Sequence, residues 1–173
     1  AQGVERSNVD FYPLYIANQI FAGQGLTSRV SKAAREDKGL TYGVYSYLLL
    51  KDKANMIKGG FSATEGNFAK VQDIVNAEWR KMGTEGVNEE ELEQAKNYLI
   101  ASYNLRFADL DTISAILVAM QEEKLGLDFL DKRNEYVSAV TLDEVNAAAA
   151  RYFTAEGPVW VNLGKFANTG SMK

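Results

Sequence analysis

The sequence predicts an α+β fold in which helices pack on one face of a small, mostly antiparallel sheet. Three observations lead to this prediction. The 173 residues suit one domain, 46% of them are apolar, and stretches with a helical apolar period surround short β-type runs. No internal repeat, low-complexity tract or interdomain linker interrupts this pattern. We therefore expect residues 1–173 to form a single domain.

Two helices are expected before the first strand. Asp10 stands where it can cap a helix over residues 11–22, whose apolar residues recur at helical spacing. Thr27 or Ser28 can cap a second helix. Gly39 is a natural end for that helix, because glycine adopts the left-handed conformation that terminates many helices.

A β-hairpin is expected next. Residues 41–50 are rich in Tyr, Val and Leu, and residues 56–63 form a second β-type run. The polar residues 51–53 between them predict a turn. The pair Gly59-Gly60 indicates either a bulge or a close backbone approach.

The remainder is expected to be mostly helical. Apolar periodicity and two capping-box patterns predict helices around residues 68–82, 88–103, 113–120, 129–137 and 141–150. Alternating apolar residues then predict a returning strand at 158–163. Two or three strands make a thin sheet, so a further strand either precedes residue 1 or comes from a partner.

Composition excludes several functions for this chain alone. It contains no His and no Cys, whereas catalytic zinc sites nearly always include one of them. The same absence excludes Ser-His and Cys-His nucleophile pairs. The net charge of −4 argues against nucleic acid or an anionic membrane as a partner. No apolar stretch approaches the roughly 20 residues that span a bilayer.

Residues 23–47 carry a recognisable arrangement of motifs. A glycine-containing loop is followed by Ser28-Arg29-Val30, by Arg35-Glu36 near a helix end, and by Gly39-Leu40-Thr41-Tyr42 entering a strand. This arrangement resembles the second, non-zinc domain of the insulinase/pitrilysin family of zinc metallopeptidases. The segments 88–96, 139–145 and 161–164 resemble later parts of the same domain. The likeness thus extends from about Asp10 to Gly164 and is closest to compact bacterial members.

The resemblance implies half of a larger peptidase. In this family one half carries an inverted zinc motif, and the other offers an Arg and a Tyr across a closed chamber. Arg35 and Tyr42 match that pair in type and in their spacing of seven, so the resemblance implies catalytic and substrate-binding roles for both. It also implies a peptide substrate and a zinc-bearing domain or subunit as partner, with no metal bound by this chain. The chain would be inactive alone, and a periplasmic or secreted location would follow for a bacterial parent whose signal peptide is removed.

Other readings of these residues stay open. The family also contains non-catalytic subunits that serve assembly, so an interaction module is the alternative function. Arg29 is expected to anchor structure through an ion pair, and Glu89, Glu90 and Glu91 to form a solvated helix N-terminus. Tyr45 and Tyr47 are expected to share the strand face opposite Tyr42, where either packing or a partner surface could use them.

Overall fold

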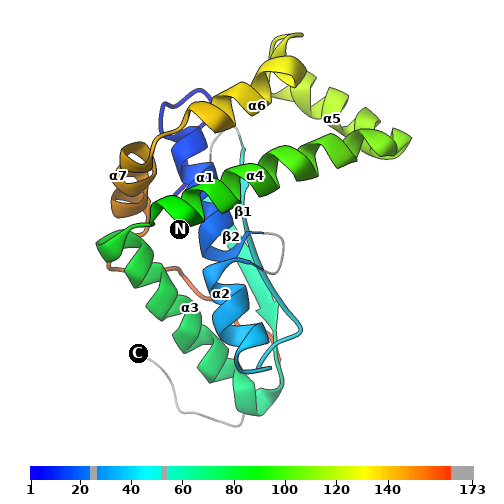
Figure 1. Cartoon of the computed structure of the whole chain (residues 1–173). Helices are drawn as coiled ribbons and strands as arrows, with labels where there is room; N and C mark the ends of the chain where they lie inside the picture. The colour runs from blue at the N-terminus through cyan, green and yellow to red at the C-terminus, as the bar shows by residue number, and fades with distance from the viewer. Residues whose placement is uncertain (24–26, 52–53, 165–173) are drawn as a thin grey trace.

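The computed structural model describes residues 1–23, 27–51 and 54–164. Helix α1 (Phe11–Ala22) lies at the centre of the molecule, with the other helices and the hairpin arranged around it (Figure 1). Ten of its twelve residues are buried, which is the pattern of a core helix rather than a surface one. The predicted bounds of this helix are confirmed.

The hairpin consists of β1 (Gly43–Leu49) and β2 (Met56–Ser62), paired antiparallel in continuous register from Gly43 opposite Ser62 to Leu49 opposite Met56. The side chains of Val44, Ser46 and Leu48 point toward the core, and α1 packs against β1. The alternate side chains, including Tyr45, Tyr47 and Lys58, are exposed. Helices therefore cover one face of a small antiparallel sheet, as the sequence predicts.

The remaining elements are mostly helices. They are α2 (Arg29–Ser31), the π-helical turn η1 (Lys32–Glu36), α3 (Glu65–Glu85), α4 (Glu89–Leu105), the short 3₁₀ turn η2 (Arg106–Ala108), α5 (Leu110–Glu122), α6 (Phe129–Ala139) and α7 (Leu142–Tyr152). Both predicted capping boxes are present, at the starts of α4 and α7. No helix in the described part of the chain is long and apolar enough to cross a membrane.

An aromatic cluster joins three helices in the core. Trp79 of α3 packs 4.5 Å from Phe153 and 5.5 Å from Phe21 of α1, measured between ring centroids. The indole N–H of Trp79 donates to the carbonyl oxygen of Thr154 at 2.9 Å, so the buried ring leaves no unpaired donor. These contacts fix α3 and the end of α7 against α1.

Three local predictions are wrong. Ser28 occupies the N-cap position of α2, but its side chain makes no capping hydrogen bond. Asp10 occupies the N-cap position of α1 but makes no capping hydrogen bond; its carboxylate instead accepts from the Arg151 guanidinium and, at 3.0 Å, from the Tyr152 hydroxyl. Residues 158–163 form no strand, although their side chains alternate. Trp160 points inward to contact Phe61 and Asn76, while the alternate apolar side chains are exposed.

The glycine pair in β2 reflects a close approach and not a bulge. The pairing with β1 continues one-to-one through Gly59 and Gly60. A Cβ on Gly59 would lie 2.5 Å from the Tyr45 carbonyl oxygen, and one on Gly60 would lie 3.1 Å from the Tyr45 hydroxyl. Two of the three residues of the predicted turn at 51–53 lie outside the described part of the chain.

Candidate functional site

Arg35 and Tyr42 lie at the two ends of one short surface segment. The helix that carries Arg35 widens into the π-helical turn η1, in which the Asp37 N–H donates to the Lys32 carbonyl oxygen at 2.9 Å. Gly39 then reverses the chain with a φ of +60°, and its N–H donates to the Arg35 carbonyl oxygen at 2.9 Å. The predicted helix stop at Gly39 is confirmed, whereas the π-helical widening was not predicted.

The backbone beside Tyr42 is held firmly. Leu40 packs against the core, and its N–H donates to the Ala34 carbonyl oxygen at 2.8 Å. Thr41 is buried, and its hydroxyl donates to the Ser62 carbonyl oxygen at 2.6 Å while accepting from the Gly43 N–H at 3.2 Å. Tyr42 thus lies immediately before β1, attached to a residue fixed to both strands.

Both side chains of the candidate pair point away from the core. By its position Tyr42 would continue the series of inward-facing residues of β1, two residues before Val44. It is nevertheless 89% exposed, because the strand begins only at Gly43. Arg35 is also exposed. Within the described residues, neither side chain makes a hydrogen bond or an ion pair, and the structure shows no hydrogen bond between them. Their functional groups are free to contact another molecule.

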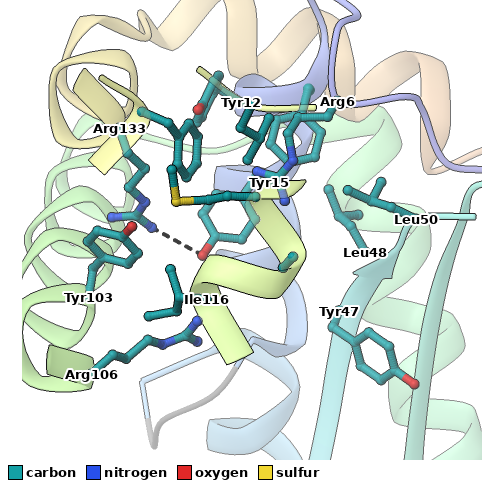
Figure 2. A pocket seen from close by; sticks show the side chains of 15 residues that line it. Arg6, Tyr12, Tyr15, Tyr47, Leu48, Leu50, Tyr103, Arg106, Ile116 and Arg133 are labelled. Carbon is teal, nitrogen blue, oxygen red and sulfur yellow. Dashed lines mark hydrogen bonds between the residues drawn. The ribbon is translucent and has the colours of Figure 1, made fainter. Parts of the chain in front are cut away.

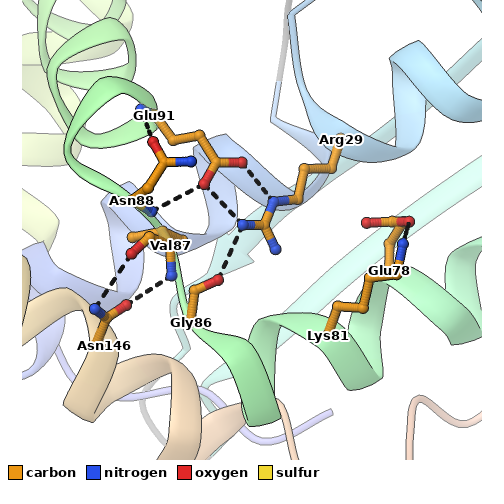
Figure 3. A network of polar contacts seen from close by, with 8 residues as sticks. All are labelled: Arg29, Glu78, Lys81, Gly86, Val87, Asn88, Glu91 and Asn146. Carbon is orange, nitrogen blue, oxygen red and sulfur yellow. Dashed lines mark hydrogen bonds and ion pairs between the residues drawn. The ribbon is translucent and has the colours of Figure 1, made fainter.

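A polar network connects the start of α2 to α4 (Figure 3). Arg29 donates from Nε and Nη2 to the two carboxylate oxygens of Glu91, at 2.6 and 2.7 Å, and from Nη2 to the Gly86 carbonyl oxygen at 2.9 Å. Burial raises the pKa of Glu91, but hydrogen bonds from Arg29 and the Asn88 N–H together hold that pKa below its ordinary value. The hydrogen bonds between Arg29 and Glu91 act in the opposite direction on Arg29 and raise its pKa.

This network corrects one prediction and confirms another. Arg29 is the structural anchor that the sequence suggested. Glu91 is not part of a solvated acidic cluster, because its carboxylate is bound to Arg29 and also closes the capping box of α4. Glu89 and Glu90 are exposed, as expected.

The donor groups of this chain do not fit a catalytic zinc ion. The sequence offers no imidazole and no thiolate. In the described part of the chain, no three carboxylates converge in a way that could hold a metal ion.

Sequence analysis missed one feature, a cavity beside α6. Arg133 lines this cavity and is only 5% exposed. A signal was available, because Arg133 interrupts the apolar stripe formed by Phe129, Leu130, Tyr136 and Val137 at helical spacing. A charged residue at such a position is buried only if polar groups surround it, and the sequence alone does not reveal those groups.

Comparison with known proteins identifies the family. The family model of the peptidase M16 inactive domain matches residues 1–99. The uncharacterised zinc protease YmxG of Bacillus subtilis strain 168 is 28% identical over 160 residues, and the uncharacterised zinc protease ML0855 of Mycobacterium leprae is 26% identical over 127 residues. These alignments cover 90% and 73% of this chain but only 38% and 28% of the relatives, so the chain spans well under half of their length.

Solved structures show the same fold. The peptidase M16 inactive domain from Pseudomonas fluorescens superposes with a TM-score of 0.76 at 24% identity, over 94% of this chain and 40% of that one. An inactive peptidase domain from Bordetella parapertussis superposes with a TM-score of 0.70 at 18% identity, over 90% of this chain and 84% of that one. Since the family model also matches more than half of its residues, this chain belongs to the peptidase M16 inactive-domain family.

Proposed function

We propose that this chain holds extended peptide substrates and stabilises the transition state of their hydrolysis, opposite a zinc site on another domain or subunit. Arg35 and Tyr42 carry both tasks. Membership of an inactive-domain family supports the first part, because such a domain needs a zinc-bearing partner to take part in hydrolysis. The short coverage of the zinc-protease relatives is consistent with a partner half outside this sequence.

One observation carries the assignment to these two residues. The backbone at Arg35 and Tyr42 is fixed by Gly39 and Thr41, yet both side chains are exposed and make no polar contact with the described residues. An arginine that served only stability would be expected to bind a carboxylate or carbonyl, as Arg29 does. A fixed backbone with free functional groups is the arrangement that binding requires.

The chemistry of the pair suits a peptide carbonyl under attack. The Tyr42 hydroxyl can donate a hydrogen bond to the carbonyl oxygen as that oxygen gains negative charge, and a donor of this kind contributes about 10²–10³ in kcat. The Arg35 guanidinium stays charged and can donate to a neighbouring substrate carbonyl, which fixes the register of the peptide. Tyr42 is therefore assigned mainly to the rate of the chemical step, and Arg35 mainly to substrate affinity.

Reconstitution with the zinc-bearing half tests both assignments. Arg35→Met is expected to raise KM for a peptide substrate with a smaller effect on kcat. Arg35→Lys should recover only part of the affinity, because an ammonium lacks the planar fork of the guanidinium. Arg80→Met on the exposed side of α3 is the matched control. Wild-type KM and kcat for both Arg35 variants would remove Arg35 from the site.

The rival function, a non-catalytic subunit that serves assembly, predicts a different result. In that case the chain would still bind its partner, but substitutions at Arg35 and Tyr42 would leave peptide turnover unchanged. The exposed, stacked pair Tyr45 and Tyr47, with ring centroids 6.2 Å apart, would be the first surface to test for assembly. Loss of partner binding in a Tyr45→Ser/Tyr47→Ser variant, with turnover insensitive to Tyr42, would favour the rival.

A further inference from the structure

A cavity of about 260 Å³ lies between helices α1, α4, α5 and α6, next to β1 (Figure 2). Its walls are mostly aromatic and aliphatic, but three arginines also line it, namely Arg6, Arg106 and Arg133. Among the described residues, no Asp, Glu or Lys lines the cavity. The cavity therefore combines apolar walls with a positive charge.

Arg133 is the most deeply buried of these arginines. Its Nη1 donates to the Leu99 carbonyl oxygen at 2.8 Å and to Asn134 Oδ1 at 2.9 Å. Its Nη2 donates to the Tyr15 hydroxyl at 3.2 Å, the hydrogen bond drawn in Figure 2. All three acceptors are neutral, and in the described part of the chain Arg133 forms no ion pair. A buried guanidinium without a carboxylate partner is unusual, because charges leave water at a high cost unless they are paired.

Two N–H groups of the Arg133 guanidinium lack an acceptor among the described residues. A guanidinium has five N–H groups, so the three hydrogen bonds leave its Nε–H and one Nη2–H without an acceptor among the described residues. Arg29 uses Nε and Nη2 to hold both oxygens of Glu91. In Arg133 the same two nitrogens each keep one N–H without an acceptor among the described residues, the number of donors that a bidentate contact with a carboxylate requires.

The hydroxyl of Tyr103, a lining residue, is a second unpaired group and is enclosed beside the cavity. Tyr103 is 7% exposed, and its hydroxyl is buried without a hydrogen-bond partner. The Arg133 guanidinium carbon lies 4.3 Å from the centre of its ring. Burial raises the pKa of this phenol, while the positive charges of Arg133, Arg106 and Arg6 lower it in part, which places all three arginines within electrostatic reach. The phenol stays protonated near neutral pH and can donate.

The other two arginines have different surroundings. Arg6 is already paired with Glu123, and its guanidinium lies over the rings of Phe11 at 4.8 Å and Phe129 at 5.6 Å. Arg106 is exposed on η2 and makes no ion pair with the described residues. Among the described residues that line the cavity or pair with its lining, three arginines thus face the single carboxylate of Glu123, and the unpaired positive charge lies at Arg133 and Arg106.

We propose that this cavity binds a carboxylate carried on a short apolar stem. Arg133 holds the two carboxylate oxygens, the Tyr103 side chain turns so that its hydroxyl donates to one of them, and Arg106 attracts the anion at the cavity mouth. The aromatic and aliphatic walls receive the stem. The volume is smaller than the roughly 300–1,000 Å³ of drug-sized pockets, so the ligand is about one residue in size. A small organic acid and the C-terminal residue of a peptide both satisfy this chemistry.

Calorimetric titration of the 173-residue chain tests the proposal without any partner. The probes are 3-phenylpropanoate, its neutral amide and inorganic phosphate. Binding of the acid, with at least tenfold weaker binding of the amide and of phosphate, is the expected result. Equal binding of acid and amide, tighter binding of phosphate, or no binding of the acid at millimolar concentration would overturn the proposal.

Variants assign the binding to this cavity. Tyr103→Phe is expected to weaken the acid about tenfold, the usual effect of losing one hydrogen bond to a charged group. Arg106→Gln should weaken it about two- to fivefold, since an exposed charge contributes less. Tyr136→Phe and Arg80→Gln are the matched controls outside the cavity lining. Wild-type affinity in both cavity variants would overturn the assignment; Arg133 itself is left unchanged because its loss can unfold the chain.

A second pair of probes separates the two sources. N-acetyl-Ala-Ala-Phe and its C-terminal amide present the same carboxylate and stem at the end of a peptide. If the peptide acid binds at least as tightly as 3-phenylpropanoate, the natural ligand is a peptide C-terminus. If only the small acid binds, the ligand is a free organic acid. A peptide acid that binds no better than its amide, together with the same result for the small pair, would refute carboxylate recognition.

Discussion

The bidentate pair of Arg29 and Glu91 offers the sharpest test of how the candidate site is supported. Glu91→Gln removes the negative charge but retains a side chain that can close the capping box of α4. Arg29 then remains largely buried without its counter-charge. Two short charge-assisted hydrogen bonds are lost or weakened, each contributing about 1.5–3 kcal/mol before relaxation and solvent compensation. We expect a net loss of about 2–3 kcal/mol in the free energy of unfolding.

Urea unfolding followed by the fluorescence of the two tryptophans, the buried Trp79 and the partly buried Trp160, measures this loss. Glu90→Gln, one residue away on the exposed side, is the matched control and should change stability by less than about 0.5 kcal/mol. In a double-mutant cycle with Arg29→Met, the two substitutions should be clearly non-additive. A Glu91→Gln variant as stable as the control, or additive effects in the cycle, would refute the role of this pair.

The same pair predicts a pH dependence. The folded-state pKa of Glu91 is lower than its unfolded value, so Glu91 binds its proton more weakly in the native state. Its contribution to stability is fully present above the unfolded pKa and is lost as pH falls through the folded pKa. The stability difference between wild type and Glu91→Gln should therefore shrink in acid, below the ordinary glutamate range. A difference that stays constant down to pH 3 would contradict the assignment.

Two further predictions concern glycines. Gly39→Ala should lower the free energy of unfolding by about 1–2 kcal/mol, because no atom crowds the position and the cost comes from a side chain at a φ of +60°; unchanged urea stability would mean that the turn relaxes freely. Gly66→Ala near the start of α3 meets nothing within 4 Å and should stabilise the protein by about 0.5–1 kcal/mol, whereas Gly83→Ala would place its Cβ 2.1 Å from the Phe153 carbonyl oxygen and should destabilise it. Thermal melts that show the two α3 variants shifting in the same direction would contradict this account of the packing.

Sequence patterns predicted the elements whose information is local. The apolar period of α1, the capping boxes at Asn88 and Thr141, and the stop at Gly39 each depend on residues within one or two helical turns. The hairpin was predictable because its two strands are consecutive and only a short polar stretch of sequence separates them. These local features were enough to predict most of the helices and the hairpin.

The errors involve contacts between distant parts of the chain. Asp10 did not cap α1 because Arg151 and Tyr152, some 140 residues later, bind its carboxylate. Residues 158–163 have strand-like alternation, but only Trp160 finds a packing position, and the segment acquires no ladder partner among the described residues. Sequence spacing cannot show which distant residue supplies a partner.

The candidate site was predictable in part. Arg35 and Tyr42 were selected by motif, and their exposure agrees with a role in contacting another molecule, although their roles stay a prediction. The cavity around Arg133 was not predicted, because its lining residues come from segments spread between Arg6 and Arg133. The ion pair between Arg29 and Glu91 was predicted only in part, because the sequence suggested an ion pair for Arg29 without identifying its partner.

The central claim is that Tyr42 stabilises the transition state of peptide hydrolysis. Its most direct test is the single-turnover rate of Tyr42→Phe in the assembly reconstituted with the zinc-bearing half, at saturating enzyme, so that substrate affinity does not enter. The account predicts a rate about 10²–10³ lower than wild type, with Tyr45→Phe unaffected. A Tyr42→Phe rate within threefold of wild type would contradict it.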